Sequence, residues 1–359
     1  MTPMRKRIQF GVLAVFLFVG LGGVTACETR SETGAEVEAV SATSEELAPR
    51  GVVQRAELRE DDGIVDGDTL RAIGFGQSIR LLCIDTEETL EGEDREAATR
   101  DWEAYQEEKS AESEGPANYG TFLGNEATEF ARDFFEEYDE IFVEYQSPKN
   151  TRGFYGRHLG YVWVQDGEDG PWKNYSIEAV RAGMSPYFTS FGWCDKYHDE
   201  FEAAQKEARE AQRGIWAPNA KAYDDYEERL QRWNRRARQV GLFRTHFVDK
   251  PNTVELGTDT AMSSLRLKVG ERVIVFGALD RHAPRARPPK LHLHHRHRDD
   301  FVVVADEGLS FEQFGIDFVP NQFLYVEGQV EMYRGNPQLR VDMRSFIRDG
   351  DSPPPMRNR

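Results

Sequence analysis

The sequence predicts an α+β protein in which two small β-barrels follow one another and helices cover the first. In the first half of the chain, short apolar runs typical of strands precede amphipathic runs of helical period. In the second half, strand-like runs alternate with turns rich in Gly, Asn and Pro. A length of 359 residues is sufficient for two domains of ordinary size.

Residues 1–27 have the pattern of an export signal. Basic residues at positions 5–7 precede an apolar run over 8–24, and small residues lead into Cys27. This ending resembles a bacterial lipobox, in which Cys27 becomes the first mature residue and is lipidated. Glu28 beside it favours sorting to the outer membrane or cell surface. The alternative is a single membrane-spanning anchor, because the run approaches the ~20 residues that cross a bilayer.

The charge composition limits how the chain can bind a polyanion such as nucleic acid. Its formal net charge is −18, which argues against binding nucleic acid by bulk attraction, since counterion release needs Lys or Arg at the phosphates. Any such contact must therefore be local. Residues 28–50 are rich in Ser, Thr, Ala and Glu without an aromatic residue, which predicts a flexible acidic tether.

The first domain is expected at 51–218. Apolar patterning predicts strands at 52–58, 69–73, 78–84, 141–145 and 159–164, and helices at 123–138, 175–182 and 197–212. Between them, the acidic insertion at 89–115 contains Trp102 and Tyr105 among many acids. We expect this insertion to be a solvated helix with a short apolar stripe.

Acidic residues follow two of the expected strands. Asp68 lies in the stretch Ile64–Thr69, and Asp85 comes at the end of the next strand-like run. A hard cation such as calcium binds several oxygens, and Asp68, Asp85 and the Thr86 carbonyl could supply them. The pattern therefore predicts an oxygen-ligand cation site.

Arg80 stands beside this predicted cation site. An arginine next to a cation indicates an anion that bridges both, and phosphate fits because guanidinium and metal can neutralise different oxygens. Glu88 is then near the ion and free for another task. Arg80 and Asp85 are five residues apart and would face opposite sides of a regular strand. They can share a site only if the strand ends or bulges near Ile84.

Three motifs in order resemble the staphylococcal nuclease (thermonuclease) family. They are Val65 to Thr69, Arg80 to Glu88, and Tyr155-Gly156-Arg157. The resemblance extends from about Val52 to Trp216. The chain departs from the family pattern in two places: Glu87 replaces a usual proline and adds a charge beside the site, and the acidic insertion replaces a shorter loop.

The resemblance implies an OB-type barrel with helical cover and a calcium-dependent endonuclease. In the implied mechanism, calcium polarises the scissile phosphate, a glutamate positions or deprotonates water, and two arginines stabilise the pentavalent transition state, leaving 3′-phosphate ends. The residues at the matching positions are Asp68, Asp85 and the Thr86 carbonyl for the metal, and Arg80, Glu88 and Arg157 for catalysis.

The third motif lies in a turn just before an expected strand. From position alone Arg157 would be a solvated hairpin charge, whereas the Tyr-Gly-Arg context favours a phosphate ligand. The resemblance implies that Tyr155 and Tyr187 contact the terminal phosphate or stack on a base. For Tyr187, a place at the edge of the core is an equal alternative.

Two cysteines remain beyond Cys27. Cys83 and Cys194 would be exposed to an oxidising compartment if the chain is exported, which favours a disulfide. Cys83 lies in an apolar strand and could equally be a buried free thiol. The sequence leaves both readings open.

A second barrel is expected at 246–349, after a linking helix at 219–245 and before a disordered tail at 350–359. Strand-like runs occur at 269–277, 301–304, 324–330 and 340–347, with a turn signal at 333–339. The pattern resembles OB-fold domains of the tRNA-anticodon-binding type. Such barrels bind single strands or oligosaccharides, and others act only as protein-interaction modules.

A block of Arg, Lys and His over 281–298 stands out in this acidic protein. One interpretation is a loop or strand that follows a phosphate backbone. Another is a metal site, because His292 and His294 alternate with leucines and would share one strand face. The third is an exposed hairpin without a partner.

Together these features predict a nuclease that hydrolyses DNA and/or RNA, uses Ca²⁺, and is held in the bacterial cell envelope through lipid on Cys27. Its expected partners are nucleic acid and the membrane, and no obligate protein partner is evident. A different class of protein remains open: a catalytically weak envelope lipoprotein whose two barrels bind nucleic acid, protein or glycan. The high negative charge favours this alternative.

Overall fold

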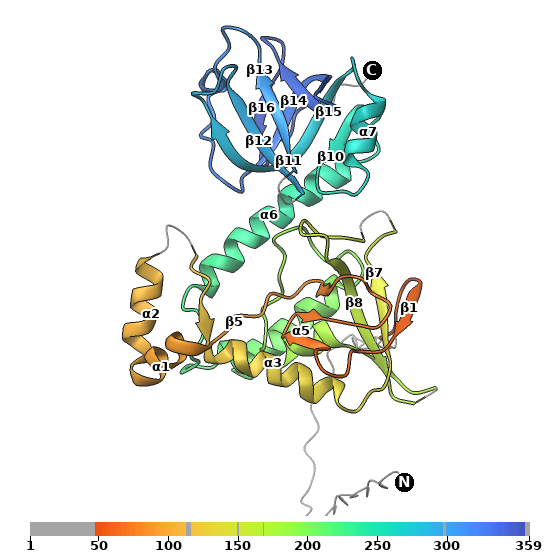
Figure 1. Ribbon diagram of the computed structural model, residues 1–359, viewed down its shortest axis with the longest axis vertical. Helices are drawn as coiled ribbons and strands as arrows, with labels where there is room; N and C mark the ends of the chain where they lie inside the picture. The colour runs from red at the N-terminus through yellow and green to blue at the C-terminus, as the bar shows by residue number, and fades with distance from the viewer. Residues whose placement is uncertain (1–46, 113–115, 149–150, 168, 297–298, 356–359) are drawn as a thin grey trace, which may run out of the picture. The chain divides into compact units, whose positions relative to one another are not determined.

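The computed structural model describes residues 47–112, 116–148, 151–167, 169–296 and 299–355 (Figure 1). Cys27 and the rest of the predicted export signal lie outside the described residues, as does most of the tether predicted at 28–50. Within the described ranges, no helix combines the length and apolar character that crossing a membrane requires.

The first domain contains a seven-stranded sheet. Its strands are β1 (Val53–Ala56), β2 (Ile64–Asp66), β3 (Thr69–Leu70), β4 (Ile79–Leu81), β7 (Ile141–Tyr145), β8 (His158–Gln165) and β9 (Trp172–Asn174). They pair in the order β1-β7-β8-β4-β3-β2, with β9 beside β8. Only β4 and β8 run parallel, and the other pairs are antiparallel. A bridge from Leu58 to Ala72 joins the segments that follow β1 and β3, so the strands curl toward a barrel.

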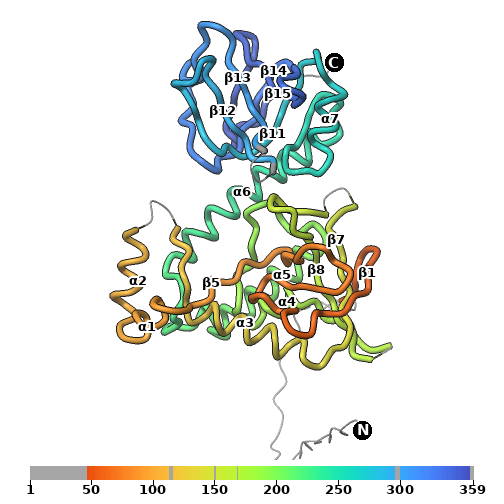
Figure 2. Tube along the Cα trace, in the orientation of Figure 1, coloured from red at the N-terminus to blue at the C-terminus, as the bar shows by residue number. Residues whose placement is uncertain are grey.

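Three helices cover this sheet: α3 (Phe122–Phe135), α4 (Tyr175–Arg181) and α5 (His198–Glu210). α3 lies beside β2, α4 beside β8, and α5 beside α4 (Figure 2). Side-chain oxygens cap two of them, because Thr121 accepts from the Gly124 amide and Asn174 from the Ile177 amide. The core between helices and sheet is aromatic, with Tyr161, Trp163, Tyr175, Tyr197 and Phe201 all buried. A 3₁₀ turn (Gly214–Trp216) follows α5.

The insertion differs from the expected solvated helix. It forms two helices, α1 (Gly92–Arg100) and α2 (Trp102–Ala111), and a short parallel pair of β5 (Glu88–Thr89) with β6 (Gly120–Thr121). Tyr105 is only 3% exposed and packs edge-on against Tyr119, 5.8 Å away between ring centroids. Tyr223 and Tyr226 complete this small core. The expected apolar stripe is present, but it is buried rather than solvated, because Tyr119, Tyr223 and Tyr226 pack around it.

A long helix, α6 (Tyr226–Phe247), follows the first domain. Near its C-terminal end, Phe243 stacks on Phe276 of the second domain with ring centroids 4.6 Å apart and planes 7° from parallel. Val240 and Phe247 join the same apolar cluster, to which Tyr325 also belongs. The predicted linking helix therefore packs firmly at both of its ends.

The second domain contains a seven-stranded sheet, and five of its strands close into a barrel, which confirms the predicted second barrel. Its elements are β10 (Thr253–Glu255), α7 (Ala261–Leu267), β11 (Arg272–Ala283), β12 (Lys290–Arg296), β13 (Asp299–Ala305), a 3₁₀ turn (Phe311–Phe314), β14 (Phe323–Tyr333), β15 (Asn336–Val341) and β16 (Ile347–Asp349). The barrel closes through parallel β13–β15 and antiparallel β11–β14 pairing. The described fold is thus α+β with seven α-helices.

Candidate active site

The turn between β2 and β3 holds Asp68 in place. The Asp68 amide donates to Oδ1 of Asp66 at 3.0 Å, and the Tyr175 hydroxyl donates to the Gly67 carbonyl at 2.8 Å. A Cβ at Gly67 would lie 2.8 Å from side-chain atoms of both Ala127 and Thr86, so only glycine fits. As a result, Asp68 is buried and its carboxylate has a fixed direction.

Asp68 joins two neighbouring segments. Its Oδ2 accepts hydrogen bonds from the Thr86 amide at 3.0 Å and from the Thr86 hydroxyl at 3.3 Å, and its Oδ1 accepts from the Thr69 hydroxyl. The same Oδ2 lies 2.7 Å from Nη1 of Arg80. One carboxylate therefore connects Arg80 to the segment that follows Asp85.

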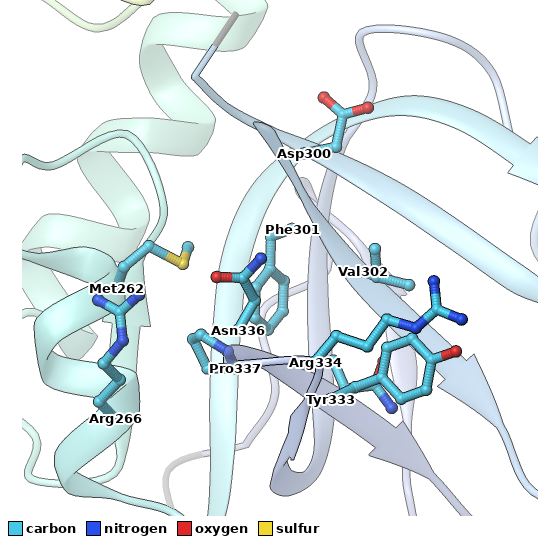
Figure 3. A pocket seen from close by; sticks show the side chains of 10 residues that line it. Met262, Arg266, Asp300, Phe301, Val302, Tyr333, Arg334, Asn336 and Pro337 are labelled. Atoms are coloured by element: carbon cyan, nitrogen blue, oxygen red, sulfur yellow. The ribbon is translucent and has the colours of Figure 1, made fainter. Parts of the chain in front are cut away.

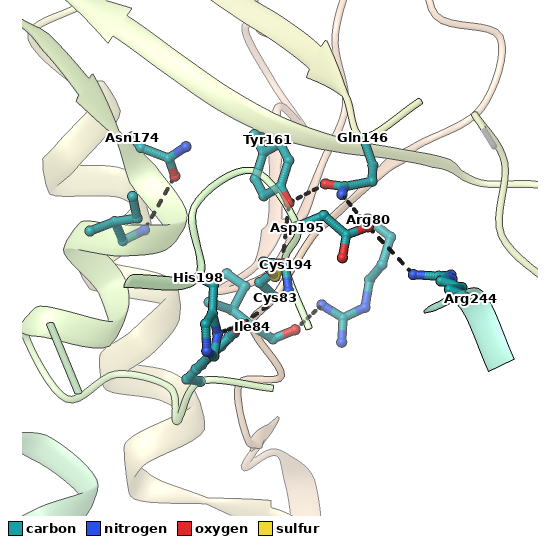
Figure 4. The surroundings of a disulfide bond; sticks show 12 residues. Arg80, Cys83, Ile84, Gln146, Tyr161, Asn174, Cys194, Asp195, His198 and Arg244 are labelled. Carbon is teal, nitrogen blue, oxygen red and sulfur yellow. Dashed lines mark hydrogen bonds and ion pairs between the residues drawn. A yellow bond between two sulfur atoms is a disulfide. The ribbon is translucent and has the colours of Figure 1, made fainter. Parts of the chain in front are cut away.

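The strand that contains Arg80 ends early, at Leu81. Cys83 has φ of 70°, a left-handed conformation that turns the chain back toward Arg80. Nη1 of Arg80 donates to the Ile84 carbonyl at 3.1 Å (Figure 4). Nη2 of Arg80 forms an ion pair with Asp85. The strand break required by the spacing of Arg80 and Asp85 is confirmed.

A disulfide supports this reversal of the chain. Cys83 and Cys194 are bonded, with their Cα atoms 6.3 Å apart, which settles the choice that the sequence left open (Figure 4). The Phe188 amide donates to the Cys83 carbonyl at 2.9 Å, and the Asp85 amide donates to the Ser185 hydroxyl at 2.9 Å. The segment 185–194 thus forms a support behind the site.

Negative charge accumulates beyond what Arg80 neutralises. Burial, followed by the charge of Asp68, raises the pKa of Asp66 to about 6. Burial also raises the pKa of Asp85 to about 6; Arg80 opposes the shift, and Asp68 and Glu88 add to it. Three carboxylates around one guanidinium fit a hard divalent cation, because all available donors are oxygens.

Glu87 and Glu88 differ in burial. Glu88 is exposed, and its charge adds to the raised pKa of Asp85, whereas Glu87 is buried and only 3% exposed. Glu87 accepts hydrogen bonds from Thr121, the Tyr223 amide and the Tyr226 hydroxyl. The sequence placed the Glu87 charge beside the site, but its carboxylate instead anchors the start of α6.

The third motif leads into β8, the strand that pairs with the strand of Arg80. Arg80 pairs with Leu159 in the parallel β4–β8 ladder, and Arg157 precedes Leu159 by two residues. The Arg157 backbone carbonyl accepts from the Gly153 amide at 2.9 Å, which closes the loop. Tyr155 is 63% exposed, and the Arg157 guanidinium lies 5.9 Å from its ring centroid. The two side chains therefore contact each other at the surface of this turn.

Tyr187 occupies a different environment. It is 3% exposed and stacks on Phe201 with ring centroids 5.1 Å apart. Its hydroxyl accepts from the Cys194 amide at 3.0 Å and lies 3.0 Å from Nδ1 of His198. Of the two placements that the sequence allowed, the structure has the one in the core, where Tyr187 packs beneath the disulfide.

Sequence reasoning overlooked three contributors to the site. Asp66 lies within the first motif. It contributes to the site by accepting the hydrogen bond from the Asp68 amide that orders the turn. Tyr175 and Ser185 are distant in the sequence and had no local signal. Their contacts with Gly67 and Asp85 arise only when α4 and the following segment pack on the sheet.

Residues 78–218 match the family model for the Staphylococcal nuclease homologue. Members of this family are nucleases, so the match supports an enzyme of that class in the first domain. The matched region contains Arg80, Asp85, Glu88 and Arg157, whereas the turn at Asp68 precedes it. No curated protein matches the chain.

The barrel has a cavity of its own, separate from the nuclease-like site. Its volume is about 250 Å³, and it lies between α7 and the turn that joins β14 to β15 (Figure 3). Arg266 and Arg334 flank it, and Tyr333, which is 53% exposed, borders the opening. The Arg334 guanidinium lies 5.3 Å from the Tyr333 ring centroid, whereas Arg266 lies across the cavity (Figure 3). An exposed aromatic ring beside a cation is a suitable surface for a nucleobase.

Proposed function

We propose that the protein is a calcium-dependent endonuclease that hydrolyses DNA and/or RNA and leaves 3′-phosphate ends. The observation that supports this most directly is the position of Arg80 between Asp68 and Asp85, next to the exposed Glu88. We further propose that lipid on Cys27 anchors the enzyme in the cell envelope, at the outer membrane or cell surface.

The residues present fit the cation that the family uses. Asp68 and Asp85 would supply carboxylates and the Thr86 carbonyl a third oxygen. Burial is the main cause of the raised pKa of Asp85, and the charges of Asp68 and Glu88 add to it. A bound Ca²⁺ supplies Lewis-acid polarisation of a phosphoryl oxygen. The chain's own side chains provide the remaining steps.

Hydrolysis of a phosphodiester needs a water molecule in line, a base and neutralisation of the developing charge. The exposed Glu88 orients the water and accepts its proton, while the oxygen forms the new bond to phosphorus. Arg80 and Arg157 bind the phosphoryl oxygens as their charge increases. The bond from phosphorus to the 5′-oxygen breaks, and this oxygen takes up a proton from solvent water. Tyr155, beside Arg157, stacks on a base or contacts the terminal phosphate.

Charge limits how substrate is held. Because the net charge is −18, few phosphates can be neutralised, and binding should weaken only slightly with added salt. The barrel offers further contacts through the cavity beside Tyr333. We propose that it is an OB-fold of the tRNA-anticodon-binding type that extends the interaction with single strands.

The test uses the purified full-length chain in mild detergent, with single-stranded DNA, duplex DNA and RNA, in calcium and in EGTA. Glu88→Gln and Arg157→Ala should each slow cleavage by on the order of 10²–10³ or more. Glu91→Gln and Arg95→Ala change exposed residues of the same charge and should cut at the wild-type rate.

The end groups of the products provide a second readout. A phosphatase that removes 3′-phosphate should make the products extendable by a polymerase. If a folded wild-type chain does not cut any of the three substrates, the enzyme proposal fails. The alternative, a lipoprotein that binds through its barrels, would then account for the high negative charge.

A further inference from the structure

Two irregularities in the barrel bring three side chains with metal-binding groups together. The β11–β12 register shifts between Leu279 and Arg281, so Asp280 sits at a bulge. The β12–β13 register shifts beyond Leu293, next to His294 and Asp300. Because β12 lies between β11 and β13, the imidazole of His294 is flanked by a carboxylate on either side.

The three groups converge on one point outside the barrel. One ligand atom each of Asp280, His294 and Asp300 lies within 4.8 Å of the other two. Leu291 and Leu293 fill the barrel interior, which places His292 and His294 on the opposite face, as their alternation predicted. Donor atoms in a tetrahedral zinc site with bonds of ~2.0–2.2 Å are about 3.4 Å apart, so small side-chain rotations suffice.

The contacts that these donor atoms make to other described residues are long. Within the described part of the chain, neither the Asp280 nor the Asp300 carboxylate accepts a hydrogen bond, and the His294 ring nitrogens make none. The contact from His294 Nδ1 to Asp280 measures 3.9 Å, and that from Arg281 Nε to Asp280 measures 3.7 Å. Both contacts are longer than hydrogen bonds but within ion-pair range, so the charges are only loosely paired. A metal ion would draw the three donor atoms closer together.

We propose that Asp280, His294 and Asp300 form a binding site for a divalent transition metal, with Zn²⁺ as its best-matched ion. An imidazole nitrogen with two carboxylate oxygens is a nitrogen–oxygen set that suits zinc, whereas calcium prefers oxygens alone. This site is distinct from the calcium site proposed at Asp68 and does not depend on nuclease activity.

The fourth position can be filled by His292 or by water. Nδ1 of His292 lies 3.8 Å from Oδ2 of Asp300, and its side chain is 15% exposed. Arg281 Nη2 lies 3.0 Å from the same nitrogen. The exposed Arg281 has to turn away before Nδ1 of His292 can bind the metal. Asp280, His294 and Asp300 do not depend on this movement of Arg281.

Phe154 connects the proposed metal site to the loop of the first domain that contains the third motif. The ring of Phe154 meets the His294 ring edge-on, with centroids 5.6 Å apart. Phe154 belongs to the loop that also contains Tyr155 and Arg157. A metal that fixes the His294 ring would therefore also restrict this loop, because ring orientation is set by coordination.

The experiment is a calorimetric titration of the full-length chain with Zn²⁺. The protein is stripped of metal, lacks a histidine tag and is kept in excess Ca²⁺ so that the Asp68 site is filled. We expect one zinc ion per chain. His294→Ala should weaken binding by on the order of 10²-fold, since loss of even an outer-shell partner costs 10–100-fold. Titration with Co²⁺ should give the visible absorption of a tetrahedral site in the wild type alone.

Two further variants decide the outcome. His246→Ala removes an exposed histidine on α6 and should bind zinc like the wild type. The Asp280→Asn/Asp300→Asn variant keeps side-chain shape and decides the matter if His294→Ala loses its fold by circular dichroism. Absence of zinc binding by the wild type, or unchanged affinity in both ligand variants, would overturn the proposal.

Discussion

Oε1 of Glu87 accepts a hydrogen bond of 2.7 Å from the hydroxyl of Tyr226, the first residue of α6. The Tyr223 amide donates to the same oxygen at 2.6 Å, and the Thr121 hydroxyl donates to the other. Because Glu87 stands between Thr86 and Glu88, this network fixes the candidate catalytic segment to the start of the long helix.

Replacement of Glu87 by Ala should destabilise the protein. Three buried donors would lose their acceptor, and each unsatisfied buried group costs about 1–3 kcal/mol. We expect the free energy of unfolding to fall by about 3 kcal/mol or more, measured by urea denaturation. Glu91→Ala, at an exposed position four residues away, should change it by less than about 0.5 kcal/mol. Equal effects of the two substitutions would contradict the anchoring role.

The same carboxyl should make stability depend on pH. Burial, opposed by its three hydrogen bonds, raises the pKa of Glu87 from 4.5 to about 6. The folded state then holds the proton more tightly than the unfolded state. The stabilisation is complete below about pH 4.5 and is lost as pH rises through about 6, a change of roughly 2 kcal/mol.

Glu87→Gln isolates this contribution because Gln does not titrate. The stability of the wild type relative to this variant should fall by roughly 2 kcal/mol between about pH 4.5 and 7. Urea unfolding of both proteins at each pH, in EGTA, measures the difference. A difference that stays constant across that range would show that Glu87 titrates at its ordinary pKa.

Local patterns in the sequence were enough to predict that Asp68, Arg80 and Asp85 lie close together. Asp68, Asp85 and Arg80 each belong to a short segment in which turn residues follow an apolar run, and the spacing of Arg80 and Asp85 required the strand break that Cys83 produces. The second barrel was predictable for the same reason, because hairpins and alternating strands are encoded by neighbouring residues.

Residues whose role depends on distant partners were harder to place. Tyr105 looked solvated among acids, yet its ring packs on Tyr119, within a cluster that includes residues at the start of α6. Glu87 looked like an extra surface charge, but Tyr223 and Tyr226 are 136 and 139 residues away. The pattern of residues in a short stretch of sequence cannot predict such contacts, because they form only when distant segments pack together.

The disulfide should contribute substantially to stability. Cys83 and Cys194 close a loop across 111 residues, and cross-links of such loops are worth about 2–5 kcal/mol. Cys83→Ser/Cys194→Ser should lower the free energy of unfolding by this amount. Reduction of the wild type should lower it equally and leave the double variant unchanged. If thiol titration shows reduction but the unfolding midpoint does not move, the cross-link has no stabilising role.

Close contact between α3 and β5 predicts that Gly124 tolerates no side chain. A Cβ at Gly124 would overlap the Glu88 carbonyl oxygen and lie 2.8 Å from that of Glu87. Gly124→Ala should therefore displace Glu88. We expect a loss of about 1–3 kcal/mol in unfolding free energy from overpacking. Cleavage should slow by on the order of 10²-fold, because a shift of about 1 Å at a catalytic group has that effect.

Gly76→Ala is the matched control for this prediction. No atom lies within 4 Å of a Cβ built at Gly76, so stability and cleavage should both be close to wild type. The two readouts separate the contact from the chemistry. If Gly124→Ala loses stability but cleaves at the wild-type rate, the α3–β5 contact is confirmed and Glu88 has no role in catalysis. Full stability in Gly124→Ala would instead show that α3 and β5 can move apart freely.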